Sequence, residues 1–353
     1  MRRAVAAALL AGALVAPEAL AQQPPTSPPV SPPAVAPQRP AAPRPAPPPK
    51  PAAGTPAKPQ ATGPAPARPA QAPDLAYGAF QRGYYLTAFH EATKRIDATQ
   101  DTRAMTLLGE LYANGLGVAQ DDRKAAEWYG LAASRGDRDA MFALAMFRLG
   151  GRAGPKDTGE ASRLLAAAAK LGHPAAAYDL GLFYVEGQLF PQDYDRAAEL
   201  FRIAAASGSP EAQYALAVLH KEGRGVRQDM AESARWMERA ATAGVVDAQV
   251  EYAIALFNGT GVPKDEARAA GLFRKAAMRG NAIAQNRLAR LLSAGRGAPA
   301  DPVEAVKWHL IATAGGAGDA YMEEFAQKQP EAVRKSAEKA AQSWLEVIRQ
   351  SRT

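Results

Sequence analysis

More than half of the chain repeats itself every 36 residues, and this period constrains the fold more than any other feature of the sequence. Counted from Ala104, an alanine recurs at each 36-residue step as far as Ala320, with no insertion or deletion. Glycine recurs six times at the same step from Gly115 and again from Gly136, and aspartate recurs six times from Asp121. Columns that stay in register over six units indicate that every unit folds in the same way.

The first half of each unit has the pattern of an amphipathic helix. An offset is the number of residues after the first alanine of a unit; unit 1 has apolar residues at offsets 0, 4, 7 and 8, which form one stripe at the helical period (Ala104, Leu108, Leu111 and Tyr112). A glycine or alanine at offset 5 is expected to let another backbone come close. The glycine at offset 11 predicts that this helix ends in a left-handed cap.

The second half of each unit predicts a second helix that starts after the aspartate at offset 17. A carboxylate there accepts hydrogen bonds from the unpaired amides of a helix start and lies favourably at the positive end of the helix dipole. In three units a glutamate follows three residues later, as in Asp157 and Glu160, which is the spacing of a capping box. Apolar or small residues at offsets 21, 24, 25, 28 and 29 continue the helical stripe, and the second glycine column ends it.

A helix pair of this kind cannot bury its apolar faces alone, so neighbouring units must stack. The sequence therefore predicts an all-α fold, an α/α superhelical solenoid of six 36-residue helix pairs with atypical helical caps at both ends. The predicted units are residues 104–139, 140–175, 176–211, 212–247, 248–283 and 284–319.

Both ends of the array are expected to be capped by helices that match the repeat less well. Residues 74–103 read as N-terminal capping helices without the glycine loop, and residues 320–353 as C-terminal capping helices. In the last of these, a stripe at the helical period predicts one packed face with charges elsewhere, as a solubilising cap requires. That stripe is Val333, Ala337, Ala340, Trp344 and Val347.

Two segments precede the array. Residues 1–21 have a basic start, an apolar stretch and an A-x-A site that ends at Ala21, which predicts a secretory signal peptide cleaved before Gln22. Residues 22–73 contain 20 of the 29 prolines and few large apolar side chains, so they are expected to form a disordered, Pro/Ala-rich linker. The chain is therefore expected to be exported, to the periplasm or alternatively as a secreted protein.

Charge and composition exclude several classes of function. Residues 1–21 carry +1 and residues 22–73 carry +5, which leaves +1 of the total of +7 for residues 74–353, a poor electrostatic match to nucleic acid. The chain has no cysteine, and its four histidines lack metal-binding spacing, so we expect no metal site and no cofactor. No run of about 20 apolar residues follows the signal, so the protein is not expected to be an integral membrane protein.

The columns resemble a known family, the Sel1-like repeats, which are relatives of tetratricopeptide repeats. Residues 104–136 match the pattern A-x-x-x-L-G-x-x-Y-x-x-G-x-G-V-x-x-D-x-x-x-A-x-x-W-Y-x-x-A-A-x-x-G almost completely, and the resemblance covers about 250 residues. Unit 2 departs from it at Arg148 and Ala153, and unit 3 departs at Leu189 and Phe190 in its loop. The resemblance implies an α-solenoid with adaptor roles in signalling, polysaccharide export, motility or cell-wall machinery.

A stripe at offsets 2, 6 and 9 of the first helices is the candidate partner-binding surface, because it is apolar in the four central units and polar in the outer two. The predicted partner-binding residues are Phe142, Tyr178, Leu182, Tyr214, Val218 and Phe257, with Phe190 in an irregular loop as a further contact. The alternative, which the pattern favours, is that these positions pack between adjacent units.

We therefore expect a non-enzymatic scaffold or adaptor of a bacterial cell-envelope assembly that binds an envelope protein, with no catalytic residue. One alternative is a peptidoglycan or glycan binder that stacks sugars on tyrosine. Another is a cell-wall or β-lactam hydrolase, for which Ser336 and Lys339 supply an S-x-x-K match without its partner motifs. A eukaryotic secretory-pathway adaptor of the same family is a further alternative, although the Ala/Arg/Pro-rich signal and linker are more typical of bacteria.

Overall fold

The structure is a computed structural model that describes residues 74–187 and 189–350. The predicted signal peptide and linker lie outside the described residues. Every secondary-structure element in the described ranges is a helix. The helices before the first unit are α2 (Leu75–Gln81) and α3 (Tyr85–Thr99), and those after the sixth are α16 (Ala320–Gln327) and α17 (Glu331–Gln350).

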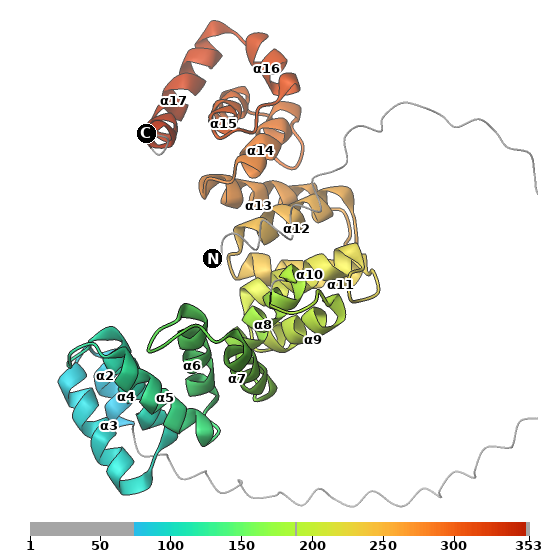
Figure 1. The fold of residues 1–353 in the computed structure, drawn as a ribbon. Helices are drawn as coiled ribbons and strands as arrows, with labels where there is room; N and C mark the ends of the chain where they lie inside the picture. The colour runs from blue at the N-terminus through green and yellow to red at the C-terminus, as the bar shows by residue number, and fades with distance from the viewer. Residues whose placement is uncertain (1–73, 188, 351–353) are drawn as a thin grey trace, which may run out of the picture. The chain divides into compact units, whose positions relative to one another are not determined.

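Between them lie twelve helices of 13 residues each, in six pairs that restart every 36 residues, and the predicted fold class is confirmed. Figure 1 shows these helices following one another as pairs along the chain. The first helices are α4 (Thr102–Asn114), α6 (Arg138–Gly150), α8 (Pro174–Glu186), α10 (Pro210–Glu222), α12 (Val246–Asn258) and α14 (Ala282–Ala294). The second helices are α5 (Asp122–Ser134), α7 (Thr158–Lys170), α9 (Tyr194–Ala206), α11 (Met230–Thr242), α13 (Glu266–Met278) and α15 (Pro302–Ala314).

The aspartate column joins the two helices of each unit in two ways. Every one of the six aspartates caps a second helix by accepting backbone amide hydrogens with its side chain, as predicted. Its own amide donates to the carbonyl at offset 8 of the first helix, as Asp121 does to Tyr112 at 3.0 Å. Because that amide is already used, it is not available to the glutamates of the expected capping boxes; Glu160, for example, bonds Arg148 instead.

Glycine is required where a loop meets the preceding unit. Gly115 ends α4 in a left-handed conformation with φ 65°, as predicted. A Cβ on Gly225 would lie 2.0 Å from the carbonyl oxygen of Tyr194, the first residue of α9 in the unit before. A side chain at this position would force the two units apart. Unit 2 has Ala153 in the same loop, with φ 61°, so its departure from the pattern is accommodated at a cost in backbone strain.

The small residue at offset 5 makes room for a ring and not, as expected, for a backbone. A Cβ on Gly109 would lie 2.5 Å from the ring of Tyr129 in the paired helix α5, and Gly181 is covered in the same way by Phe201 of α9. An aromatic ring at offset 25 therefore fills the space left by glycine at offset 5 in these two units.

The core consists of alanine columns and a few larger side chains. One hydrophobic cluster extends from Ala76 to Phe147 and a second from Ala145 to Ala341, so the two clusters meet in α6, where Met141 packs against both. In α17 the packed face is not quite the predicted stripe. Ala337, Ala341 and partly Trp344 are covered, whereas Ala340 and Val347 are exposed.

Candidate binding surface on the first helices

The seven predicted partner-binding residues divide into three that are buried and four that are half-buried. Leu182, Tyr214 and Val218 are 6%, 4% and 6% exposed, so a partner cannot reach them without a rearrangement of the helices. Burial raises the pKa of the Tyr214 hydroxyl, and that hydroxyl makes no hydrogen bond with any described residue. These three side chains belong to the hydrophobic cluster that extends from Ala145 to Ala341.

The other four residues have neighbours of their own. Phe142 stacks on His173 with ring centroids 4.5 Å apart. The ring of Phe190 stacks on Tyr184 at 4.9 Å, that of Tyr178 is tilted against Phe201 at 5.7 Å, and that of Phe257 lies 4.3 Å below the Arg296 guanidinium. Each is only half-buried, and a partner-binding role for them stays a prediction.

Two grooves lie on the first-helix side, and only Phe142 and Phe257 of the seven predicted residues line them. The N-terminal groove, about 400 Å³, is lined by residues of α4, α5, α6, the loop after α6, and the cap of α8, chief among them Glu110, Tyr129, Phe142, Met146, Arg152 and His173. The C-terminal groove, about 340 Å³, is lined by residues of α12, α13, α14, the loop after α14, and α16, chief among them Ile254, Phe257, Arg287, Arg290, Arg296 and Tyr321.

The two grooves occupy the same place in the repeat. Each is formed by offsets 6, 9, 10 and 25 of one unit and offsets 3, 6, 7 and 12 of the next. The 36-residue repeat therefore determines where a groove forms, and the residues at those offsets determine its charge and polarity.

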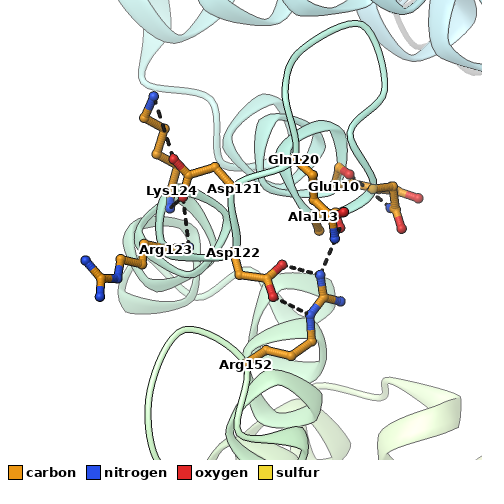
Figure 2. A network of polar contacts seen from close by, with 9 residues as sticks. Glu110, Ala113, Gln120, Asp121, Asp122, Arg123, Lys124 and Arg152 are labelled. Carbon is orange, nitrogen blue, oxygen red and sulfur yellow. Dashed lines mark hydrogen bonds and ion pairs between the residues drawn. The ribbon is translucent and has the colours of Figure 1, made fainter.

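Both grooves are bordered by an arginine at offset 12 that is fixed by an acid of the preceding unit. Figure 2 shows Arg152 between Asp122, the first residue of α5, and the end of α4. Its Nε donates to Asp122 Oδ2 at 3.0 Å, its Nη2 bonds Asp122 Oδ1, and Nη2 also donates to the Ala113 carbonyl at 2.8 Å. The same arginine lies 4.0 Å over the ring of Phe147. Hydrogen bonding from Arg152 lowers the pKa of Asp122, which keeps the pair charged.

Arg296 repeats this arrangement at the C-terminal groove. It bonds both carboxylate oxygens of Glu266, the first residue of α13, and the hydrogen bonds from Arg296 and Lys264 lower the pKa of Glu266 to about 2. Each of the two grooves is thus bordered by an ion pair of the same kind, and the two partners of each pair lie 30 residues apart in the chain.

The N-terminal groove carries an acid in a poorly solvated position. Glu110 is half-buried between α4 and α6, and burial raises its pKa. Burial and the nearby Glu110 charge also raise the pKa of Tyr129. Burial lowers the pKa of His173, whose Nδ1 accepts the amide hydrogen of Ala176 and so caps α8.

The C-terminal groove is cationic. Three of its ten lining residues are arginines, and none is an acid. Asp319, the cap of α16, holds Arg290 from outside: Arg290 Nη2 donates to Asp319 Oδ1 at 2.7 Å, and Asn286 donates to Oδ2 at 2.9 Å. Burial alone would raise the pKa of Asp319, but these hydrogen bonds outweigh it and hold that pKa well below its ordinary value.

Arg290 lies at offset 6 of unit 6, in the polar outer part of the predicted stripe, whereas Arg287 at offset 3 lies outside that stripe. The predicted stripe at offsets 2, 6 and 9 is partly buried in the core, and its offsets 6 and 9 line both grooves together with offsets 3 and 6 of the following unit. The offset-3 column contained a usable signal, because it carries a charged residue in three units, Asp179, Glu251 and Arg287.

No metal-binding cluster is present in the described residues. Residues 74–187 and 189–350 contain no group of three or more histidine or acidic side chains placed to hold a metal ion. Ser336 and Lys339 lie exposed on α17, and the Ser336 hydroxyl donates to the Ala332 carbonyl of its own helix at 2.8 Å. Across the same ranges, no helix has the length and apolar character needed to cross a bilayer.

Comparison with known proteins agrees with the repeat. The family model described as Sel1 repeat matches residues 102–137, 138–173, 174–209, 210–245, 246–281 and 282–316, and each match begins at the first residue of a first helix. No curated protein matches the chain.

Two solved structures resemble the fold. The structure of a Sel1 repeat protein from Oxalobacter formigenes aligns with a TM-score of 0.57 and 26% identity over 66% of this chain and 95% of that one. The structure of c5321, a protective antigen of uropathogenic Escherichia coli with an SLR fold, aligns with a TM-score of 0.51 and 26% identity over 74% of this chain. The present chain covers 64% of the length of that antigen.

Proposed function

The chain belongs to the Sel1 repeat family, and from this premise we propose that it is a non-enzymatic scaffold, exported to the bacterial cell envelope, that binds another protein along its first helices. Sel1 repeat proteins generally mediate protein–protein interactions. Stacked helix pairs present an extended surface whose many small contacts select a partner.

The observation that carries the proposal is the pair of grooves at equivalent positions of the repeat with different chemistry. The N-terminal groove offers Met146, 41% exposed, beside Phe142, with two acids and one arginine, whereas the C-terminal groove offers three arginines and no acid. Two differently charged grooves at the two ends of one array suit a long polypeptide that is read at two points.

The glycan alternative finds less support. It relied on tyrosine rings that stack on sugars, but Tyr214 is buried and the ring of Tyr178 packs against Phe201. The hydrolase alternative relied on Ser336, whose hydroxyl donates a hydrogen bond to the backbone of its own helix. The sequence lacks the S-D-N and K-T-G motifs that accompany S-x-x-K in such enzymes.

The test is capture of a partner from living cells by cross-linking of the tagged full-length protein, followed by mass spectrometry. The variant Met146→Glu with Arg287→Glu changes exposed positions in both grooves. The matched control is Leu131→Glu, an exposed leucine of second helix α5 that lies outside both grooves. We expect one envelope protein to be captured by the wild type and the control and lost in the groove variant. Equal capture by all three proteins would contradict binding at the grooves.

Export is tested separately. We expect the mature protein to begin at Gln22 and to be found in the periplasmic fraction, and we expect deletion of residues 1–21 to keep it in the cytoplasm. A full-length N-terminus on the protein recovered from cells would contradict export by a cleaved signal.

A further inference from the structure

The C-terminal groove combines exposed positive charge with an apolar floor. Arg287 is exposed at the groove and makes no hydrogen bond or ion pair with any described residue. Arg290 and Arg296 each direct Nε and Nη2 to a carboxylate outside the groove, to Asp319 and Glu266 respectively. A guanidinium has five N–H donors, so both arginines retain donors for a ligand while their positions are fixed.

The walls between the arginines are apolar or aromatic. Phe257 lies under Arg296, and Tyr321, 50% exposed, lies under Arg290 with its centroid 5.1 Å from the guanidinium carbon. Ile254 and Leu291 complete the floor. A ligand that fills this groove must therefore present an anion and an apolar group close to one another.

We infer that the C-terminal groove binds the free C-terminal carboxylate of a partner polypeptide whose last residue has a large apolar side chain. The inference deepens the proposed protein-binding function and rests on it. A terminal residue carries its carboxylate and its side chain on the same Cα, whereas aspartate and glutamate offer an anion without an apolar group. The carboxylate matches the planar fork of an arginine, and Arg287 is the one of the three groove arginines that has no hydrogen-bond or ion-pair partner among the described residues.

The size of the groove agrees with one residue. Its volume of about 340 Å³ is at the small end of the roughly 300–1,000 Å³ of ligand pockets. A space of this size accommodates a terminal residue with its carboxylate, and the rest of the partner chain would continue over the neighbouring first helices.

The repeat supplies an internal comparison. At the positions of Arg287 and Arg290, the N-terminal groove has Ala143 and Met146. The same hollow is thus formed without either cation, so Arg287→Ala introduces a residue that the register already accommodates. The two grooves differ in ligand chemistry and not in architecture.

The test uses full-length protein and fluorescent peptides that share one neutral spacer and carry each amino acid in turn at the C-terminus, as the free acid and as the amide. Binding is measured by fluorescence anisotropy. We expect free acids that end in large apolar residues to bind, and we expect amidation or Arg287→Ala to weaken binding by about tenfold or more, equivalent to about 1.4 kcal/mol. The control Arg202→Ala removes an exposed arginine of α9 that makes no ion pair with a described residue, and it should leave binding unchanged.

Three outcomes would overturn the inference: equal binding of acid and amide, unchanged binding by the Arg287→Ala protein with intact helicity, or no binding by any peptide. Competition by inorganic phosphate as strong as that by an unlabelled peptide acid would also overturn it, because the groove would then be a general anion site. If no peptide binds while cellular capture still recovers a partner through the grooves, this inference fails and the proposed function stands. If capture recovers no protein, the proposed function itself fails.

Discussion

Arg152 and Asp122 lie 30 residues apart in the chain and form a two-point ion pair that ties the loop after α6 to the start of α5 in the preceding unit. Arg296 and Glu266 form the same kind of ion pair between units 6 and 5, four units further along. Between them, Arg224 faces Tyr194, with the guanidinium carbon 5.5 Å from the ring centroid. The arginine at offset 12 thus occurs in units 2, 4 and 6, and the residue that it meets at offset 18 of the unit before is an acid or an aromatic ring in each case.

We expect a double-mutant cycle on Arg152→Gln and Asp122→Asn to give a coupling energy of about 0.5–1 kcal/mol, because both side chains are about one-third exposed. The coupling should decrease in high salt, since screening weakens partly exposed ion pairs. The measurement is urea denaturation of the wild type, both single variants and the double variant. The control is Arg163→Gln, which changes an exposed arginine on α7 that makes no ion pair with a described residue. A coupling energy near zero between Arg152 and Asp122 would show that this pair is only a surface contact.

A second prediction concerns the close contact between a loop and the preceding unit. Gly225→Ala places a methyl group 2.0 Å from the Tyr194 carbonyl oxygen at φ 63°, whereas Gly208→Ala at φ 92° has open space around it. Gly208→Ala should cost about 1–2 kcal/mol from backbone strain alone. Gly225→Ala should cost clearly more, because strain and collision add. Thermal denaturation of the two variants distinguishes them, and equal losses would mean that the loop moves away freely.

The periodic columns predicted the helices because each column has a local cause. Capping by aspartate, termination by glycine and burial of alanine depend on neighbouring residues in the same unit. The predicted cap was confirmed at all six aspartates. The grooves were not predicted, since they depend on how offset 9 of one unit meets offset 3 of the next. The caps of the first helices were also missed, because the capping residue there varies among aspartate, serine, asparagine and histidine.

The third prediction separates two roles of Asp319, which caps α16 and holds Arg290. Asparagine keeps the cap and loses the ion pair, whereas alanine loses both, so Asp319→Ala should be less stable than Asp319→Asn by about 1 kcal/mol. The pKa of Asp319 is lowered in the folded state, so its contribution is complete above the unfolded value of 3.8 and is lost as pH falls through the folded value. The stability gap between wild type and Asp319→Asn should therefore narrow only below about pH 4. A gap that is constant down to pH 2 would contradict the ion pair.

Glu110 should show the opposite dependence on pH. Burial raises its pKa, so the folded state binds a proton more readily than the unfolded state, and the carboxylate destabilises the fold at neutral pH. Glu110→Gln should therefore be more stable than wild type at pH 7, and the advantage should disappear as pH falls through the raised pKa of Glu110 toward its ordinary value of 4.5. Thermal melts across this range test the prediction. A neutral-pH loss of stability in the glutamine variant would show that the carboxylate has a stabilising partner.

The last prediction follows from the one first helix of units 1–6 whose cap is incomplete. At offset −3 the side chains of Asp101, Asp137, His173, Ser209 and Asn281 accept an amide hydrogen, but α12 begins after Val245, which makes no such bond. Its backbone already has the extended conformation of the others, with φ −67° and ψ 116°, so Val245→Asn requires no change of geometry. The new cap should add about 0.5–1 kcal/mol of stability after loss of some apolar packing. Urea denaturation measures the gain, with Val245→Ala as the control that loses the same packing without the cap. If the asparagine variant is no more stable than the alanine variant, the capping amides of α12 are already satisfied by solvent.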